Sequence, residues 1–531
     1  MGRLIFLAAA VTATGLVAFA ARYSPWAWMA MAVVGPLVVL GLVDMIQPKR
    51  AIRRNFPVAG HIRYLLEAIR PEIMQYFIEQ NHDGRPVNRE LRSVVYQRAK
   101  GDLATLPFGT QQDVYEPGYE WIDHSMSAHH LGHDFEEPRL TIGGERCTQP
   151  YGASVLNISA MSYGSLSSRA VLSLNGGAKD GAFFHNTGEG GVSPYHLEPG
   201  GDLCWQIGTG YFGCRAADGG FDPKSFAEKA ILPQVKLIEV KLSQGAKPGH
   251  GGILPAKKVT EEISAIRGVP MGQDVLSPPT HRAFSTPIGL LEFCDQLRQL
   301  SGGKPVGFKL CVGHWHEFLA ICKAIEETGL APDFISVDGG EGGTGAAPLE
   351  FSNRVGSPLT EGLIFVHNAL VGFGIRDHIK IIASGKILTG FHLAQRIALG
   401  ADLCASARGM MFALGCIQAL KCNSNECPTG VATQKPGLVI GLDVDHKRAR
   451  TARYHDETVM AFYELLGAAG LRHPSELMPH HIHRRIAPHE VRDYGELYEW
   501  LEPGQLLSDE LPPRWRAAMA RAQSSSFAVA S

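Results

Sequence analysis

The stretch IKIIASGKILTGFHLAQRIALGADLCAS, residues 379–406, joins two short apolar runs through a glycine loop and a helical segment. The runs are IKIIAS at 379–384 and ADLCAS at 401–406. Short apolar runs that are bounded by glycine turns and alternate with helical segments are typical of the buried strands of a parallel sheet. The stretch therefore predicts one strand–helix–strand unit of an α/β fold.

The same rhythm extends back to residue 154. Six further candidate strands precede this unit: SVLNISA (154–160), GAFFHN (181–186), LCWQIG (203–208), LIEVKL (237–242), VGFKLC (306–311) and FISV (334–337). A doubly wound sheet uses fewer strands and usually carries G-x-G-x-x-G after the first, whereas MSYGSLSS follows here. We therefore predict an α/β fold, a (β/α)8 TIM barrel over 150–435 that includes a cysteine-rich loop.

The N-terminus contains two uncharged apolar runs, residues 4–20 and 25–43. Each is near the length that crosses the hydrocarbon core of a bilayer. The basic residues Lys49, Arg50, Arg53 and Arg54 follow the second run, and such flanks stay in the cytoplasm. We predict two transmembrane helices within 1–46, in the inner (cytoplasmic) membrane, with the catalytic domain in the cytoplasm. The alternative is a cleaved signal peptide, but the second apolar run favours a hairpin anchor.

Helical segments flank the predicted barrel on both sides. Residues 47–149 are predicted to form a helical N-terminal region, broken at Pro71, and residues 436–531 a helical tail whose long helix stops at Gly470. The formal net charge of −2 gives no reason to expect a nucleic-acid partner. Ten cysteines in 531 residues fit a reducing compartment and exclude a small disulfide scaffold.

Barrel enzymes place their chemistry on the loops that follow the strands. The loops SGKILTG (384–390) and ASARGMM (405–411) fit the phosphate of flavin mononucleotide (FMN), although many barrels bind phosphate there without a flavin. Lys309 lies inside an apolar strand, and its charge suits the N1–C2=O edge of a reduced flavin. In the glycine-rich loop after residue 242, Lys247 either binds a carboxylate or carbonyl or belongs to a solvated loop.

Three cysteines follow the last predicted strand with the spacing C-x5-C-x4-C: Cys416, Cys422 and Cys427. They do not share one helix face, so they lie on a loop. Zinc sites usually have four ligands at shorter spacing, whereas iron–sulfur loops often end in Cys-Pro, as this one does at Pro428. From spacing alone, a [3Fe–4S] cluster, a zinc site and incidental thiols all remain open.

Seven motifs along the chain occur in the order of one known family: SAMSYGSLS (159–167), NTGEGG (186–191), QGAKPGHGG (244–252), LPAKKV (254–259), SPPTH (277–281), GGTGAAP (342–348) and CPTGVATQ (427–434). In these motifs the chain resembles the FMN-binding synthase domain of glutamate synthase. It is most similar to the membrane-anchored, single-domain members called flavin-binding glutamate synthase family proteins.

The resemblance implies FMN, a [3Fe–4S] cluster on the three cysteines, and synthesis of L-glutamate from 2-oxoglutarate and ammonia. It implies catalytic roles for Glu189, where ammonia arrives, and for Lys247. It also implies substrate contacts from Gln244, Lys247 and Arg267. The flavin contacts that we expect are Met161, Ser162, Gln206, Lys309, Ser384, Gly385, Ala407 and Arg408.

The chain departs from the family pattern at several places. The ammonia-releasing amidotransferase domain is absent from the sequence, so ammonia is expected free or from a separate glutaminase. We find no second nucleotide-binding domain, so electrons are expected from a separate protein or carrier.

Single residues also differ from the family pattern. His250 and Ile253 stand where the family has Glu and Gln, Glu341 replaces an Asp, and Tyr211 replaces an Arg. These changes keep two alternatives open: an amine or amino-acid dehydrogenase that feeds a membrane electron carrier, and a non-catalytic electron-transfer subunit.

Overall fold

The computed structural model describes residues 1–102, 105–132 and 135–529. The chain divides into two compact units, one from Met1 to Glu90 and one from Leu91 to Ser531. The boundary lies in helix α5 (Arg89–Lys100).

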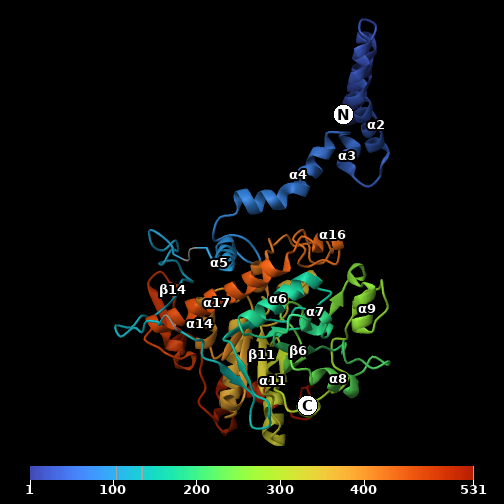
Figure 1. The fold of residues 1–531 in the computed structure, drawn as a ribbon. Coiled ribbons are helices and arrows are strands. Elements are labelled where there is room, and N and C mark those ends of the chain that lie inside the picture. Colours follow the sequence, from blue (N-terminus) through green and yellow to red (C-terminus); the bar gives the residue numbers. More distant parts are fainter. Residues whose placement is uncertain (103–104, 133–134, 530–531) are drawn as a thin grey trace. The chain divides into compact units, whose positions relative to one another are not determined.

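The first unit begins with the expected pair of apolar helices (Figure 1). They are α1 (Gly2–Ala20) and α2 (Met31–Ile46), joined by the 3-10 turn η1 (Pro25–Ala30). Both helices are long and apolar enough to cross a membrane when η1 is counted with α2, and no residue of α1 is buried. The helices touch at Gly41, where a Cβ atom would lie 2.0 Å from the ring of Phe6.

Three helical segments follow the pair: α3 (Ala51–Asn55), α4 (Gly60–Ile73) and the π-helical turn η2 (Met74–Ile78). The break expected at Pro71 does not occur, because Pro71 lies inside α4 and the helix continues to Ile73. The π turn η2 then follows the helix directly.

The second unit contains the predicted barrel. Eight parallel strands close in the order β10-β11-β12-β13-β4-β5-β6-β7. Each coincides with one of the eight apolar runs. The strands are β4 (Leu156–Ile158), β5 (His185–Asn186), β6 (Leu203–Ile207), β7 (Val235–Lys241), β10 (Val306–Leu310), β11 (Phe334–Asp338), β12 (Lys380–Ser384) and β13 (Leu403–Ser406). The first and last strands, β4 and β13, pair with Cys404 opposite Leu156 and so close the ring.

The barrel interior is filled with apolar side chains from its strands. A short hairpin, β2 (Leu140–Ile142) and β3 (Tyr151–Ala153), adds Ile142 and Ala153 to this core. The other buried members of this core cluster are Phe184, Cys204, Leu237, Phe334, Ile382, Leu403 and Ala405. Because one end of the barrel is packed with apolar side chains, we expect the polar groups of an active site at the other end, where the C-terminal ends of the strands lie.

Helices surround the barrel and are capped by their own sequence. Thr286 and Thr389, for example, accept backbone N–H groups at the starts of α10 and α14. The helices that cover the barrel are α6 (Ser168–Asp180), α8 (Pro223–Ala230), α10 (Pro287–Leu300), α11 (Trp315–Thr328), α13 (Leu359–Gly372), α14 (Gly390–Ala398) and α15 (Arg408–Leu414). The long helix α17 (Val444–Ala468) packs on α6, α14 and α15, and Gly470 follows its end as expected.

The flanking regions are not wholly helical, which corrects the sequence prediction. The region predicted as helical over 47–149 contains β1 (Glu120–Ile122) and β2 after Lys100. The tail contains β14 (Ile482–Ala487) and β15 (Glu490–Asp493), and β1 pairs with β14. Strands of three to six residues with mixed burial leave no clear period in a sequence, so this shared sheet was not foreseen.

Candidate active site

A small hollow lies inside the barrel, near the ends of the strands. Its volume is about 10 Å³, and it is lined by Ser159, Phe184, Asn186, Glu239, Lys309, Ser336, Ile382, Ser384 and Ala405. Its polar centre is Glu239, which accepts hydrogen bonds from Asn186 Nδ2 (2.8 Å), Gln206 Nε2 (2.7 Å) and Ser336 Oγ (2.5 Å). Three hydrogen-bond donors therefore satisfy this buried carboxyl group.

The side chain of Lys309 brings a positive charge into this hollow. Its Nζ lies 3.3 Å from Asp338 Oδ2, and the same oxygen accepts the backbone N–H of Gly245 at 2.9 Å. Burial by itself would lower the pKa of Lys309, but Asp338 and Glu239 outweigh it and raise the pKa. Lys309 is therefore a permanent cation at the position expected for a flavin-facing lysine.

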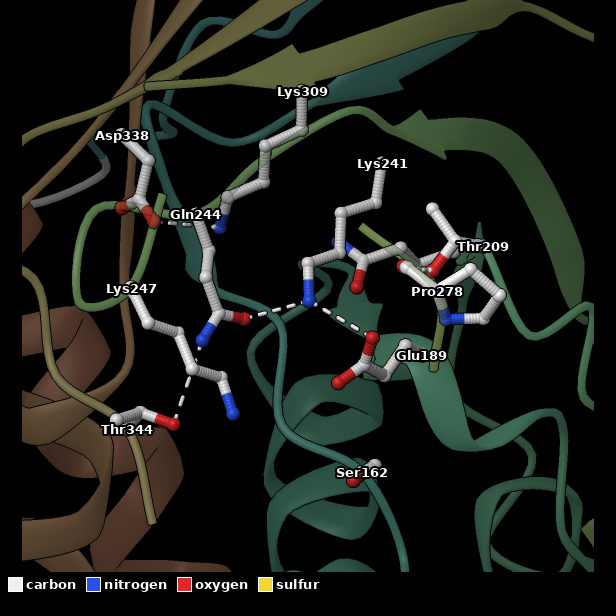
Figure 2. Close-up of polar contacts among 12 residues, drawn as sticks. Ser162, Glu189, Thr209, Lys241, Gln244, Lys247, Pro278, Lys309, Asp338 and Thr344 are labelled. Carbon is white, nitrogen blue, oxygen red and sulfur yellow. Dashed lines mark hydrogen bonds and ion pairs between the residues drawn. The ribbon is translucent and has the colours of Figure 1, made fainter. Parts of the chain in front are cut away.

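A chain of polar contacts crosses the mouth of the barrel (Figure 2). Lys241 Nζ, at the end of β7, donates to Glu189 Oε2 at 2.9 Å and to Gln244 Oε1 at 2.7 Å. Gln244 Nε2 then lies 3.4 Å from Thr344 Oγ1 in the loop after β11. Three loops that are distant in sequence thus meet around one carboxylate.

Two glycines allow the carboxylate of Glu189 to sit so close to the backbone. A Cβ atom at Gly208 would lie 2.8 Å from Glu189 Cβ, and one at Gly252 would lie 2.5 Å from Oε1. Burial alone would raise the pKa of Glu189, but the cations of Lys241, Lys247 and Arg267 lower it below its usual value. Glu189 is therefore held ionised.

Lys247 lies beside this carboxylate with most of its donors free. Its Nζ donates to Ala346 O at 2.9 Å, and an ammonium has three N–H groups. Burial lowers the pKa of Lys247 to about 8, while Glu189 acts in the opposite direction. Near neutral pH the side chain is a cation that still has donors for an anionic ligand.

Arg267 ends α9 (Glu261–Arg267) and is also buried. Its Nη2 donates to Tyr163 O at 3.0 Å and lies 3.4 Å from Ser162 Oγ, and its guanidinium stacks over Phe212 at 5.1 Å. Its Nε has no hydrogen-bond partner among the residues that the structure describes. Burial lowers the pKa of Arg267 to about 10, so it remains charged.

The residues predicted to bind the flavin lie on three strands, β6, β10 and β12, and on the segments that follow β4, β12 and β13. Gln206 points into the barrel toward Glu239, and Ser384 Oγ lies 3.1 Å from Ser159 Oγ. Met161 and Ser162 are buried in the loop after β4. Gly385, Ala407 and Arg408 follow β12 and β13, but Arg408 Nη2 donates to Glu341 O at 2.5 Å, so its guanidinium turns toward the loop after β11.

The three cysteines lie on one loop after α15. The backbone N–H groups of residues 429, 431 and 432 and the Thr429 hydroxyl face Cys427 Sγ; although burial opposes them, they lower the pKa of this thiol. By contrast, burial raises the pKa of Cys416 to about 12. Among the described residues, no three His, Cys, Asp or Glu side chains are gathered closely enough to hold a metal ion.

A buried lysine joins the cysteine loop to the loop that follows β4. Lys258 Nζ donates to Ser165 O at 2.9 Å and to Ala432 O at 3.0 Å. Burial lowers the pKa of Lys258 to about 8, and Cys422 and Cys427 act against that shift. A buried cation thus lies close to two of the three thiols of this loop, Cys422 and Cys427.

Another wall of the site contains Tyr211, a departure from the family pattern, and His281 of the motif SPPTH. Burial lowers the pKa of His281 to about 4, so its ring is neutral at pH 7. Its Nε2 lies 2.9 Å from Lys241 O and its Nδ1 3.1 Å from Tyr211 OH, which also accepts the N–H groups of Arg282 and Ala283. This arrangement fixes the end of β7, from which Lys241 projects.

Sequence reasoning did not find every polar group of the site. Glu239 was missed, although it is a charge inside the apolar run LIEVKL, the same signal that marked Lys309. Asp338 was not assigned a role from the sequence, and its contact with Lys309 depends on the pairing of β10 with β11. Of the loop lysines, only Lys247 was assigned a role, and the contact of Lys241 with Glu189 was not predicted.

Known proteins resemble the chain over most of its length. The conserved region in glutamate synthase matches residues 112–472. The glutamate synthase large subunit-like protein YerD of Bacillus subtilis is 37% identical over 488 residues, which cover 84% of this chain and 93% of that protein.

Other matches are more partial. The archaeal glutamate synthase [NADPH] of Methanocaldococcus jannaschii is 37% identical over 316 residues, so the chain spans 58% of the length of that relative. Among solved structures, a lactate oxidase of Pediococcus acidilactici aligns with a TM-score of 0.40 and 12% identity, covering 78% of this chain and 92% of that one. The chain is an oxidoreductase that belongs to the glutamate synthase family.

Proposed function

We propose that this enzyme reductively aminates 2-oxoglutarate with ammonia to L-glutamate, using FMN and a [3Fe–4S] cluster. The observation that carries the proposal is the ionised Glu189 in contact with Lys241 and beside Lys247, whose N–H groups are largely free. Such a site offers a base for an ammonium ion and cations for a dicarboxylate at the same place.

The cofactors are proposed from the residues that fit them. FMN would be held by Lys309, by the buried loop residues Met161 and Ser162, by Gln206 and by the phosphate-side residues Ser384, Gly385, Ala407 and Arg408. Lys309 offers a cation and Ser159 and Ser384 offer hydroxyls at the same hollow, which is a donor set that suits the polar edge of a flavin. When bound, FMN supplies the hydride that reduces an imine carbon.

The protein's own side chains would carry the remaining chemistry. Lys247 and Arg267 bind the carboxylates of 2-oxoglutarate, and the Lys247 cation also polarises the carbonyl. Glu189 accepts a proton from ammonium, and the ammonia so formed adds to the carbonyl with loss of water to give an imine. Gln244, held by Lys241 and Thr344, orients the substrate.

Electrons would enter through Cys416, Cys422 and Cys427, which would hold the cluster that supplies one-electron transfer. Their donor is a separate protein or carrier, and ammonia is taken up free or from a separate glutaminase.

We further propose that α1 and α2 anchor the enzyme in the inner membrane through residues 4–43, with the barrel in the cytoplasm. Two exposed apolar helices followed by basic residues support this orientation.

A second function is favoured by one observation, the replacement of polar family residues by His250 and Ile253. His250 packs edge-on against Phe351 with ring centroids 5.0 Å apart, and its Nδ1 is buried without a partner in the described structure. A less polar wall suits another amino or keto acid. The alternative is therefore an amine or amino-acid dehydrogenase that passes electrons to a membrane carrier.

One set of measurements separates the two functions. The purified full-length protein is expected to show flavin bands in its anaerobic visible spectrum and a three-iron EPR signal when oxidised. Glutamate synthase activity predicts that 2-oxoglutarate with ammonia reoxidises the reduced flavin, and that other keto acids do so poorly. Rapid flavin reduction by a different amine would favour the dehydrogenase, and a spectrum without flavin bands would reject both.

The pH dependence of substrate binding provides a further prediction. Because the pKa of Lys247 is about 8, its charge is lost above that pH and the KM for the keto acid should rise, approaching about tenfold per pH unit. The stability effect has the opposite sign: the folded pKa lies below the ordinary 10.5, so this group's contribution to stability increases from pH 8 to 10.5. Unfolding caused by the titration of Lys247 therefore cannot account for a rise in KM above pH 8.

The matched control for this pH profile is Lys247→Arg. A guanidinium stays charged over the whole range, so the rise in KM above pH 8 should disappear even if the overall KM is higher. A KM that rises equally in both proteins would assign the titration to another group.

A further inference from the structure

An unpartnered apolar stripe runs along α4 in the first unit. Ile62, Leu65, Leu66, Ile69 and Ile73 occupy positions i, i+3, i+4, i+7 and i+11, which place them on one face of the helix. The first four are exposed, Leu65 by 61%, and Gly60 is the one buried residue of α4. Residues 1–90 are all described, and nothing in this unit covers the stripe.

The stripe continues beyond the helix end. The π turn η2 adds Tyr76, Phe77 and Ile78, and Phe77 is 84% exposed. A surface helix of a soluble domain normally buries such a face. An exposed apolar face of this length therefore requires an occupant.

The start of α4 is fixed to the end of the apolar hairpin. Asp44, in the last turn of α2 and 2% exposed, accepts the backbone N–H of Val58 at 3.0 Å and lies 2.9 Å from His61 Nε2. His61 is the second residue of α4. Figure 1 shows α4 turning away from the axis of the hairpin at this point. If α2 crosses a bilayer, α4 begins at the bilayer surface.

Basic side chains gather at the same end of the hairpin. Arg3 Nε donates to Arg54 O at 2.8 Å, and the guanidinium groups of Arg50 and Arg53 stack on the ring of Tyr64 at 4.6 and 4.9 Å. Lys49 follows the end of α2. Asp44, the acidic residue of this region, is buried and already paired with His61. The exposed charge at this end of the hairpin is therefore positive, whereas α4 itself carries Glu67 and Glu72 as well as Arg63 and Arg70.

We propose that α4 and η2 form an in-plane membrane contact that recognises anionic phospholipids. The apolar stripe enters the boundary between headgroups and acyl chains, and the basic residues bind phosphate headgroups. The inference rests on the proposed membrane anchor of α1 and α2. A bilayer is chosen as the occupant because the stripe starts where the hairpin ends. The basic residues at that end of the hairpin carry the charge that attracts anionic lipids.

The test uses the full-length protein in vesicles of phosphatidylcholine with phosphatidylglycerol. An environment-sensitive fluorescent amino acid replaces one residue at a time: Leu66 in the stripe, Glu67 on the opposite face, or Leu16 within α1. Brominated lipids quench a probe that contacts acyl chains. We expect quenching at Leu66 to exceed that at Glu67 by about threefold or more, and at a shallower depth than at Leu16.

A second experiment tests whether the contact depends on the negative charge of the lipid. In phosphatidylcholine alone, or in the double variant Arg50→Gln/Arg54→Gln, quenching at Leu66 should fall while quenching at Leu16 is unchanged. Equal quenching at Leu66 and Glu67 would overturn the inference. So would a blue-shifted but unquenched probe at Leu66, because protein rather than lipid would then cover the stripe.

The outcomes also separate this inference from the anchor on which it rests. A quenched probe at Leu16 with no quenching at Leu66 leaves the anchor standing and rejects the in-plane helix. No quenching at either position rejects the anchor, and the in-plane helix with it.

Discussion

Replacing Glu189 with Gln is expected to lower kcat for ammonia-dependent glutamate formation by about 10²- to 10⁴-fold, the range of a lost general base. The amide has nearly the same shape, so Lys241 Nζ keeps an oxygen to which it can donate. What disappears is the negative charge that takes the ammonium proton. The measurement is steady-state turnover at saturating 2-oxoglutarate and varied ammonium.

The pH profile distinguishes a base from a structural residue. In the wild-type protein the acid limb of kcat/KM should reflect ionisation of Glu189, whose pKa is lowered by the surrounding cations despite its burial. In Glu189→Gln the residual rate should lose that limb and increase with the free ammonia concentration. Glu198→Gln, the same change at an exposed position nine residues further on, serves as the control. Full activity of Glu189→Gln at neutral pH would remove Glu189 from the mechanism.

Removing the Asp338 carboxylate is expected to be the most damaging change to stability within the site. Asp338→Ala leaves Lys309 as a buried cation without its contact at 3.3 Å, and such a loss typically costs about 3–5 kcal/mol of unfolding free energy. It also leaves the Gly245 N–H without its acceptor. Because Gly245 lies between Gln244 and Lys247, the KM for the keto acid should rise in the folded fraction.

Unfolding in denaturant, followed by intrinsic fluorescence, measures the first effect. Asp338→Asn keeps the shape and should lose less stability than Asp338→Ala. The control is Glu426→Ala, which breaks an ion pair with Lys435 that is at least half exposed on both sides, where salt bridges contribute little. An Asp338→Ala protein as stable as this control would show that Lys309 does not depend on Asp338.

The barrel strands were predictable because of how they are buried. Runs such as IKIIAS and LIEVKL face the core on one side and helices on the other, so they are mostly apolar on both faces and easily distinguished from helices with one apolar stripe. The same uniformity makes a charged residue inside a strand conspicuous, which is why Lys309 was identified. The strands β1 and β14 lack this signal because their burial is mixed.

The partners within the site were harder to predict. The pairing of Glu189 with Lys241 joins the loop after β5 to the end of β7, and it depends on the order of strands around the barrel. A sequence names the charged residues but does not give the rotamers that bring them together. The Tyr211–His281 contact is a similar case, since nothing in the sequence linked Tyr211, a departure from the family pattern, with His281 of the motif SPPTH.

The position of Lys258 constrains the order in which this protein can be assembled. Its ammonium joins Ser165, in the loop after the first barrel strand, to Ala432, at the end of the cysteine loop that follows α15, and β4 and β13 meet at the seam where the ring closes. Contacts so distant along the chain form late in folding. We therefore expect the cysteine loop to reach its final shape after the ring has closed, so that a folded barrel precedes any change made to that loop.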